Sequence, residues 1–197
     1  MNAKIFDNLA KIISIVFSPY LINMFAPIIL ILFVNGQNMS SIFYIELWYL
    51  FDVALPGLYI VRIQGRKFIS DLHIQNKDNR LLPMLMIVLC SALLVIIYQY
   101  IDAPKLIIIS AFVFFVNTIV ILSITIFWKI SIHIAAYSGI ISILGLVISG
   151  QAFWLMLLIP LIIWARVRRK RHTVWQGIWG GFVPFVITYL ILLVVSP

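Results

Sequence analysis

Seven long apolar segments separated by short polar stretches constrain the fold of this chain more than any other feature. The segments cover about residues 12–34, 42–61, 82–101, 106–128, 132–149, 151–165 and 177–195. A helix of about 20 residues crosses the hydrocarbon core of a bilayer, and lipid offers no partner to an unsatisfied backbone group. The pattern therefore predicts an all-α integral membrane protein with six to seven transmembrane helices.

Two of these segments decide whether the chain has six or seven transmembrane helices. The first contains Pro19, Asn23 and Pro27, so it is either kinked within the membrane or begins as an interfacial helix. The sixth, residues 151–165, is short for a span and is expected to be tilted or sheltered by its neighbours. No soluble domain interrupts the pattern. We therefore predict one transmembrane domain over residues 1–197, with the candidate site in a core of about residues 60–190.

The composition excludes several functional classes. Hydrophobic residues make up 64% of the chain and charged residues 10%, which excludes an ordinary soluble protein. The net charge of +8 comes largely from basic residues at the ends of apolar segments, where they meet lipid headgroups or an anionic ligand rather than nucleic acid. There is no zinc-ligand spacing, P-loop or glycine-rich dinucleotide turn, and the single cysteine excludes an intramolecular disulfide. We expect a multi-pass protein of the cell membrane, and the sequence offers no motif for a metal or cofactor.

The stretch from Trp164 to Gly181 carries the strongest candidates for chemistry. It contains, in order, Arg166, Arg168, Arg169, Lys170, Arg171, His172 and Gln176. Planar guanidinium groups suit phosphate oxygens. If a helix begins near His172, Gln176 lies one turn along it, and its side-chain oxygen can accept from one ring nitrogen and fix the tautomer. The alternative is a basic loop of the kind that marks the cytoplasmic side of a membrane, with an incidental histidine.

A second polar group lies between the segments 106–128 and 132–149. It consists of Lys129, Ser131 and His133, whose burial is costly unless they are paired or hydrated. A lone histidine in such a place is usually structural. A second histidine on the same membrane surface, however, suits a nucleophile and general acid pair.

Arg80 lies just before the third apolar segment, in a polar loop that also contains Lys77. Pro83 follows at a position suited to the first turn of a helix. If every segment crosses the membrane, the loops after the second, fourth and sixth segments share one face. Arg80, His133 and Arg166 are then expected to converge there.

Two polar residues lie inside the apolar segments themselves, Asp52 and Asn117. Asp52 either neutralises a cation at the site or hydrogen-bonds to neighbouring helices, and Asn117 is predicted to link two helices. A carboxyl group within a membrane segment is costly, so Asp52 needs a compensating partner of some kind.

The three polar stretches, taken in their order along the chain, resemble the motifs of the type-2 phosphatidic acid phosphatase (PAP2) superfamily. That family carries a Lys–six residues–Arg-Pro stretch, a Pro-Ser-Gly-His stretch, and Ser-Arg–five residues–His–three residues–Asp. The third motif appears here as Ala165-Arg166, His172 and Gln176 at the same spacing, and the second as Ile130-Ser131-Ile132-His133. The first is represented by Arg80, with Pro83 two residues later than the family's proline and His73 in the place of its lysine. The resemblance covers about residues 60–190.

The resemblance implies a PAP2-like helical bundle and a membrane lipid phosphatase that acts through a phosphohistidine intermediate without a metal ion. His172 would attack phosphorus, Gln176 would hold its ring, and His133 would protonate the leaving oxygen. The substrate would be a lipid phosphate or diphosphate of the polyprenyl diphosphate or phosphatidate type. The residues that the resemblance assigns to phosphate binding are Arg80, Ser131 and Arg166, with Lys77 or Lys129 in place of the missing lysine.

One departure from the family pattern favours a second interpretation. Gln176 stands where the family has aspartate, and a neutral amide can orient the His172 ring but cannot stabilise an imidazolium by charge. A lipid-phosphate-binding pseudophosphatase without turnover is therefore an alternative. A small transporter is a further one, although the sequence has no inverted repeat and few charges along a membrane path.

The orientation in the membrane is left open by the sequence. The excess of lysine and arginine in the site loops predicts that this face lies in the cytoplasm. The resemblance instead implies a site that faces the periplasm or the exterior.

Overall fold

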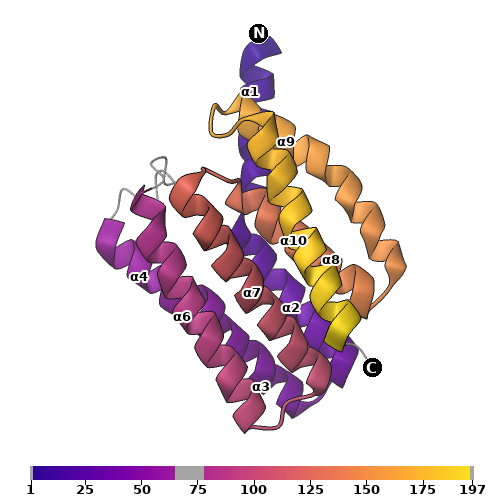
Figure 1. The fold of residues 1–197 in the computed structure, drawn as a ribbon. Helices are drawn as coiled ribbons and strands as arrows, with labels where there is room; N and C mark the ends of the chain where they lie inside the picture. Colours follow the sequence, from indigo (N-terminus) through magenta and orange to yellow (C-terminus); the bar gives the residue numbers. More distant parts are fainter. Residues whose placement is uncertain (1, 65–77, 196–197) are drawn as a thin grey trace. The chain divides into compact units, whose positions relative to one another are not determined.

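The computed structural model describes residues 2–64 and 78–195, and all regular structure within these ranges is helical (Figure 1). Each of the seven apolar segments lies in helix, so the prediction of an all-α chain is confirmed. The helices form two compact units: Met1–Ile22 with Lys129–Pro197 (unit 1), and Asn23–Trp128 (unit 2). Each unit is described by itself below.

Five helical stretches are long and apolar enough to cross a membrane. They are Met39–Arg62, Leu81–Tyr100, Lys105–Phe127, Gly150–Arg168 and Val174–Val195. A sixth span results if the bent pair Ala3–Val16 and Pro19–Asn35, which meet at 44°, is counted as one. The apolar helix Ile132–Val147 is shorter than this test requires. These lengths are compatible with a multi-pass membrane protein.

The bend in the first segment lies where proline predicts it. Two residues separate the end of helix α1 (Asn2–Val16) from Pro19, which opens helix α2 (Pro19–Asn35). Proline disfavours helical backbone at the residue before it, here Ser18, which separates the two helices. Pro27, in contrast, lies within α2.

Unit 1 is built around helix α8 (Ile132–Val147), of whose 16 residues 12 are buried, so it is an interior helix. Helix α10 (Val174–Val195) and the continuous η2–α9 stretch pack against it (Figure 1). Helix α1 packs on α9 through Ala10, Ile13 and Ala165. An ion pair of 2.8 Å between Arg168 and Asp7 joins the same two helices at the surface.

The segment predicted at 151–165 is longer than the sequence pattern indicated. It runs without a break through η2 (Gly150–Leu158), a 3₁₀ helix, and α9 (Ile159–Arg168), for 19 residues in all. Pro160 has no N–H, so the Met156 carbonyl cannot receive an α-helical bond; it accepts from the Ile159 N–H instead. The extra length carries Arg166 and Arg168 within the helix rather than in a loop.

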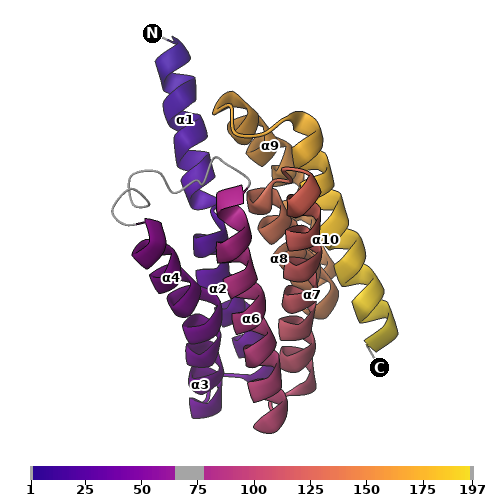
Figure 2. The same ribbon diagram turned by 60° about the vertical axis from the view of Figure 1, so that its left-hand side comes forward.

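Unit 2 contains α3 (Met39–Trp48), the π-helical stretch η1 (Tyr49–Ala54) and α4 (Leu55–Gln64), which follow one another without a break (Figure 2). Helices α6 (Asp78–Tyr100) and α7 (Lys105–Phe127) are joined by a short turn and lie side by side in both views. Because α6 begins at Asp78, Pro83 is its sixth residue and does not lie in the first turn as predicted.

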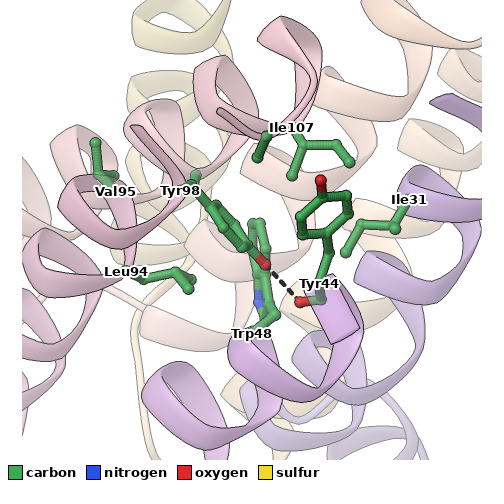
Figure 3. Packing of buried hydrophobic residues seen from close by; sticks show 9 residues of the cluster. Ile31, Tyr44, Trp48, Leu94, Val95, Tyr98 and Ile107 are labelled. Atoms are coloured by element: carbon green, nitrogen blue, oxygen red, sulfur yellow. Dashed lines mark hydrogen bonds between the residues drawn. The ribbon is translucent and has the colours of Figure 1, made fainter. Parts of the chain in front are cut away.

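The core of unit 2 is aromatic and aliphatic (Figure 3). The Tyr98 hydroxyl donates to the Tyr44 carbonyl over 2.6 Å, and the two rings pack edge to face. The fully buried Trp48 packs against Phe114 with ring centroids 5.9 Å apart. These contacts fix the register of α3 against α6 and α7.

Candidate functional site

The start of α8 and the start of α10 meet in unit 1 and bring together five of the predicted site residues. The Ser131 N–H donates to the Gln176 carbonyl over 3.2 Å. Arg166 reaches His133, and His172 reaches Gln176. We call these residues the polar cluster: Ser131, His133, Arg166, His172 and Gln176.

Arg166 lies in the last turn of α9 and is only 2% exposed. One of its terminal nitrogens, Nη1, lies 3.5 Å from Nε2 of His133, at the outer limit of a hydrogen bond. A guanidinium can only donate, so Nε2 of His133 must be the acceptor in this contact. A hydrogen bond at this contact therefore requires the neutral ring of His133 with its proton on Nδ1.

The turn after α9 places His172 directly beyond this arginine. The Arg171 N–H donates to the Arg166 carbonyl over 3.0 Å, and the Lys170 N–H donates to the Val167 carbonyl over 2.8 Å. This pair of bonds is a Schellman motif. Its left-handed position, usually glycine, is Lys170 with φ 53°. This tight reversal brings Arg166 and His172, with five residues between them, into one cluster.

Helix α10 begins at Val174, two residues later than the sequence interpretation assumed. Thr173 and Gln176 form a capping box. The Gln176 side-chain oxygen accepts from the Thr173 N–H over 3.1 Å, and the Thr173 hydroxyl accepts from the Gln176 N–H over 3.3 Å. The T-V-W-Q sequence carries the signature of this motif, and the sequence interpretation missed it.

The capping box also settles the tautomer of His172. The Thr173 backbone nitrogen can only donate, so the atom of Gln176 that faces it must be the amide oxygen. The same oxygen lies 3.1 Å from Nδ1 of His172, which must therefore carry a proton. In the neutral ring Nε2 then holds the lone pair. That is the nitrogen able to attack an electrophile.

Ser131 lies at the N-terminus of α8, is fully buried, and forms no side-chain cap on that helix. Its hydroxyl has no hydrogen-bond partner among the residues that the structure describes. Buried donors of this kind favour a partner oxygen, and the positive end of a helix dipole favours an anion. Ser131 is thus placed to donate to an anionic ligand.

Charge is distributed unequally between the two units. Unit 1 has eight lysines and arginines and a single acidic residue, Asp7, so its formal charge is 8 − 1 = +7. Unit 2 has six basic and five acidic residues, which gives 6 − 5 = +1. The carboxylate of Asp7 is engaged by Arg168. Unit 1 therefore has the electrostatic character of an anion-binding unit.

Of the remaining predicted site residues, the structure describes the side chain of Lys129 but not those of Arg80 and Lys77. Lys129 is half-buried in the junction before α8, two residues from Ser131. Arg80 belongs to the first turn of α6 in unit 2, but its side chain lies outside the described part of the structure, as does Lys77. Their part in phosphate binding stays a prediction. The described side chains include no group of three or more His, Cys, Asp or Glu residues that could hold a metal ion.

Close packing of α10 on the start of α8 holds the cluster together. A Cβ at Gly180 would lie 2.9 Å from the Ser131 carbonyl oxygen, closer than side-chain atoms approach a backbone atom. At Gly177 an added Cβ would meet Ile163 at 2.7 Å. Glycine at these positions lets the two helices approach closely.

We expect Gly180→Ala to lower the free energy of unfolding by about 1–3 kcal/mol, because the new methyl group must displace backbone rather than a flexible side chain. Unfolding of the purified protein in mixed detergent micelles measures this. Gly57→Ala is the matched control, since a Cβ there meets nothing within 4 Å and alanine favours helix by about 0.5–1 kcal/mol. Equal effects of the two substitutions would contradict the close approach at Ser131.

Comparison of the chain with known protein families, with curated proteins and with solved structures finds no match.

Proposed function

We propose that this chain is a membrane lipid phosphatase that removes the phosphate or diphosphate head of a lipid without a metal ion. The observation that carries the proposal is the polar cluster, in which a buried guanidinium, two histidines and a fixed histidine tautomer lie within one small region. Guanidinium groups can take the place of metal ions on phosphoryl oxygens. The charge of +7 on unit 1 supports an anionic substrate.

In the first step, Nε2 of His172 attacks the terminal phosphorus and forms a P–N bond while the P–O bond to the leaving group breaks. The leaving group is the lipid alcohol or, for a diphosphate, the lipid monophosphate. His133 gives a proton to the leaving oxygen. In the second step, water attacks the phosphohistidine, His133 accepts the proton of the water, and the P–N bond breaks to release inorganic phosphate. Arg166 and the Ser131 hydroxyl hold the nonbridging oxygens in both steps.

His133 must gain a proton before it can act as the acid. The hydrogen bond that its Nε2 can accept from Arg166 requires the neutral ring. A phosphate dianion between Arg166 and His133 would accept the hydrogen bonds of the guanidinium. Its negative charge would favour the protonated imidazolium of His133. Substrate binding itself would thus prepare the general acid.

The proposal includes a particular fold and substrate. It assigns the chain to the PAP2 superfamily as a divergent member, with six or seven spans in the cell membrane. The lipid tail, polyprenyl or diacyl, would lie in the bilayer, and the phosphate would reach the polar cluster. Lys129 would supply a further positive charge near the head group.

Phosphate release by the purified protein in detergent, with a chelator present, tests the proposal. The substrates are farnesyl diphosphate, a longer polyprenyl diphosphate and phosphatidate. We expect release of inorganic phosphate from at least one of them, together with an acid-labile, base-stable phosphoryl label on the protein during turnover. No release from any of the three would overturn the assigned substrates, and release without the label would overturn the phosphohistidine.

A specific observation supports a second candidate, a lipid-phosphate-binding protein without turnover. Both acceptor positions of the neutral Gln176 oxygen are occupied, by His172 and by the helix cap. The residue can therefore be explained by structure alone.

Gln176→Glu separates the two candidates. Glutamate has the same reach, keeps the capping box and adds the negative charge that stabilises an imidazolium. If the wild type is a phosphatase, we expect this variant to stay active in the release assay. If only the variant releases phosphate, the wild-type chain is the binding protein.

A further inference from the structure

A buried carboxyl group in unit 2 takes no part in the function proposed above. Asp52 lies near the middle of the membrane-length stretch Met39–Arg62 and is 5% exposed. Both of its carboxylate oxygens are buried and have no hydrogen-bond partner within residues 2–64 and 78–195. An ionised carboxylate is strongly disfavoured in such a place unless a positive species accompanies it.

The backbone around Asp52 is also unusual, for a reason that the sequence supplies. Pro56 lies four residues after Asp52 and has no N–H, so the Asp52 carbonyl cannot receive an α-helical hydrogen bond. The helix widens to a π-helix over Tyr49–Ala54, where the Leu55 N–H donates to the Leu50 carbonyl five residues earlier. Such single-turn π segments are frequent at functional sites.

The register of the neighbouring helices places polar groups of α6 at the level of Asp52. Tyr98 of α6 bonds to Tyr44 of α3, and the two helices run in opposite directions. Asp52 lies eight residues after Tyr44, and Cys90 lies eight residues before Tyr98, which is about 12 Å along each helix axis. The neighbouring Ser91 is 1% exposed.

Two further helices contribute at this level. The Tyr49 hydroxyl donates to the Met24 carbonyl, which joins α2 to η1 at the residue that follows Asn23 in the chain. Asn23 is 8% exposed, and its side-chain oxygen is buried with no described partner. On α7, Phe114 packs on Trp48, which lies one turn before Asp52. The buried Asn117 lies one turn after Phe114 along α7. Helices α2, α6 and α7 thus each bring a polar side chain to the level of η1.

The chemistry of this layer is that of hydrogen-bond acceptors. Asp52 brings two carboxylate oxygens, and Asn23 brings an amide oxygen. The Ser91 hydroxyl donates to the Val88 carbonyl over 3.1 Å. Toward any other neighbour the Ser91 oxygen can therefore only accept. The buried indole N–H of Trp48 is a donor at the previous turn, but it makes no hydrogen bond to Asp52. Oxygen ligands around one carboxylate suit a small cation.

We infer that unit 2 holds a site for a small monovalent cation, a proton or a sodium ion, with Asp52 as its anionic ligand and the oxygens of Asn23 and Ser91 beside it. A divalent ion is not favoured, because Asp52 is the only buried acidic side chain among the residues that the structure describes, and one carboxylate balances one charge. The site belongs to unit 2 alone and does not depend on the phosphatase chemistry proposed for unit 1.

Few titratable groups on the elements packed against η1 can compete with Asp52. Glu46 and Arg62 are exposed and lie one and a half turns or more away from it along the helix. No titratable side chain lies in α7 beyond Lys105 at its first residue. The groups that the structure describes on the neighbouring elements are Tyr20 on α2, Tyr44 and Glu46 on α3, Tyr49 within η1, Tyr59 and Arg62 on α4, and Cys90, Tyr98 and Tyr100 on α6.

Labelling of the purified full-length protein with dicyclohexylcarbodiimide tests the inference. This apolar reagent reacts with protonated carboxyl groups inside membranes, and peptide mass analysis locates the adduct. We expect an adduct on Asp52 that is lost in Asp52→Asn and unchanged in Glu46→Gln, the matched control on an exposed carboxylate of the preceding helix. Coelution of the variants with the wild type in size-exclusion chromatography verifies that they are folded.

Labelling in different buffers identifies the cation. If sodium slows the labelling of Asp52 at constant pH, relative to choline at the same ionic strength, the site takes sodium. If only a rise in pH slows it, the site takes a proton. Absence of an Asp52 adduct in the folded wild type under all of these conditions would overturn the inference, as would labelling that responds to neither sodium nor pH.

Discussion

Replacing His172 with alanine should lower the rate of phosphate release by about 1,000-fold or more, because loss of a nucleophile removes the covalent route altogether. The phosphoryl label on the protein should disappear with the activity. The fold should survive, since Gln176 keeps its bond to the Thr173 N–H and α10 keeps its cap. Single-turnover release from the best of the three lipid substrates, with label capture by rapid quenching, measures both effects.

The control for His172→Ala is a thermal melt of the same preparation. We expect the free energy of unfolding to change by about 1 kcal/mol, because the Gln176 and Thr173 bonds that cap α10 are kept. A folded variant that still forms the label would show that another residue is the nucleophile. Such a result would sink the assignment of His172 even if the protein proved to be a phosphatase.

Arg166→Ala should lower the rate by about 100-fold or more, the usual effect of removing one donor that stabilises transition-state charge. Arg166→Lys should recover only part of this loss, because an ammonium keeps the charge but lacks the planar fork of donors. Both variants should lower kcat as well as raise KM, since the phosphoryl group gains charge contacts in the transition state. Steady-state kinetics with one lipid substrate separates the two constants.

Arg168→Ala is the matched control for Arg166. It lies two residues along the same helix, is 40% exposed, and pairs with Asp7 at the surface instead of joining the polar cluster. Loss of an exposed ion pair costs about 1 kcal/mol or less, so activity should stay near the wild-type value. Equal loss of activity in the two variants would mean that the basic stretch attracts the substrate through its total charge. The specific role of Arg166 would then be wrong.

The helical class of the fold could be predicted because apolar periodicity and length are local properties of the sequence. The residue types at Arg166, His133 and His172 could be singled out for the same reason, since buried polar groups are rare in apolar stretches. The contact between His172 and Gln176 was expected from helical spacing, but its actual geometry is different. It depends on a capping box that starts the helix at Val174.

Other features could not be predicted because they depend on backbone choices that composition does not specify. The reversal after α9 uses Lys170 in a left-handed conformation, which sequence preferences assign to glycine. The extended stretch from Gly150 to Arg168 depends on packing against α8, and the loop-like appearance of its basic end hid two helical arginines. The division into two units of unequal charge rests on tertiary contacts that join the first 22 residues to the last third of the chain.

The double use of the Gln176 oxygen has an evolutionary consequence. One atom both caps α10 and holds the His172 ring, so selection for a stable helix preserves the ring geometry even in a lineage that has lost catalysis. Most substitutions at this position would be eliminated for their effect on folding before any effect on chemistry could be selected. Glutamate is an exception, because it fits the cap and lies a single base change from either glutamine codon. Under the proposed function, a single substitution at Gln176 would thus separate binding from turnover within one fold.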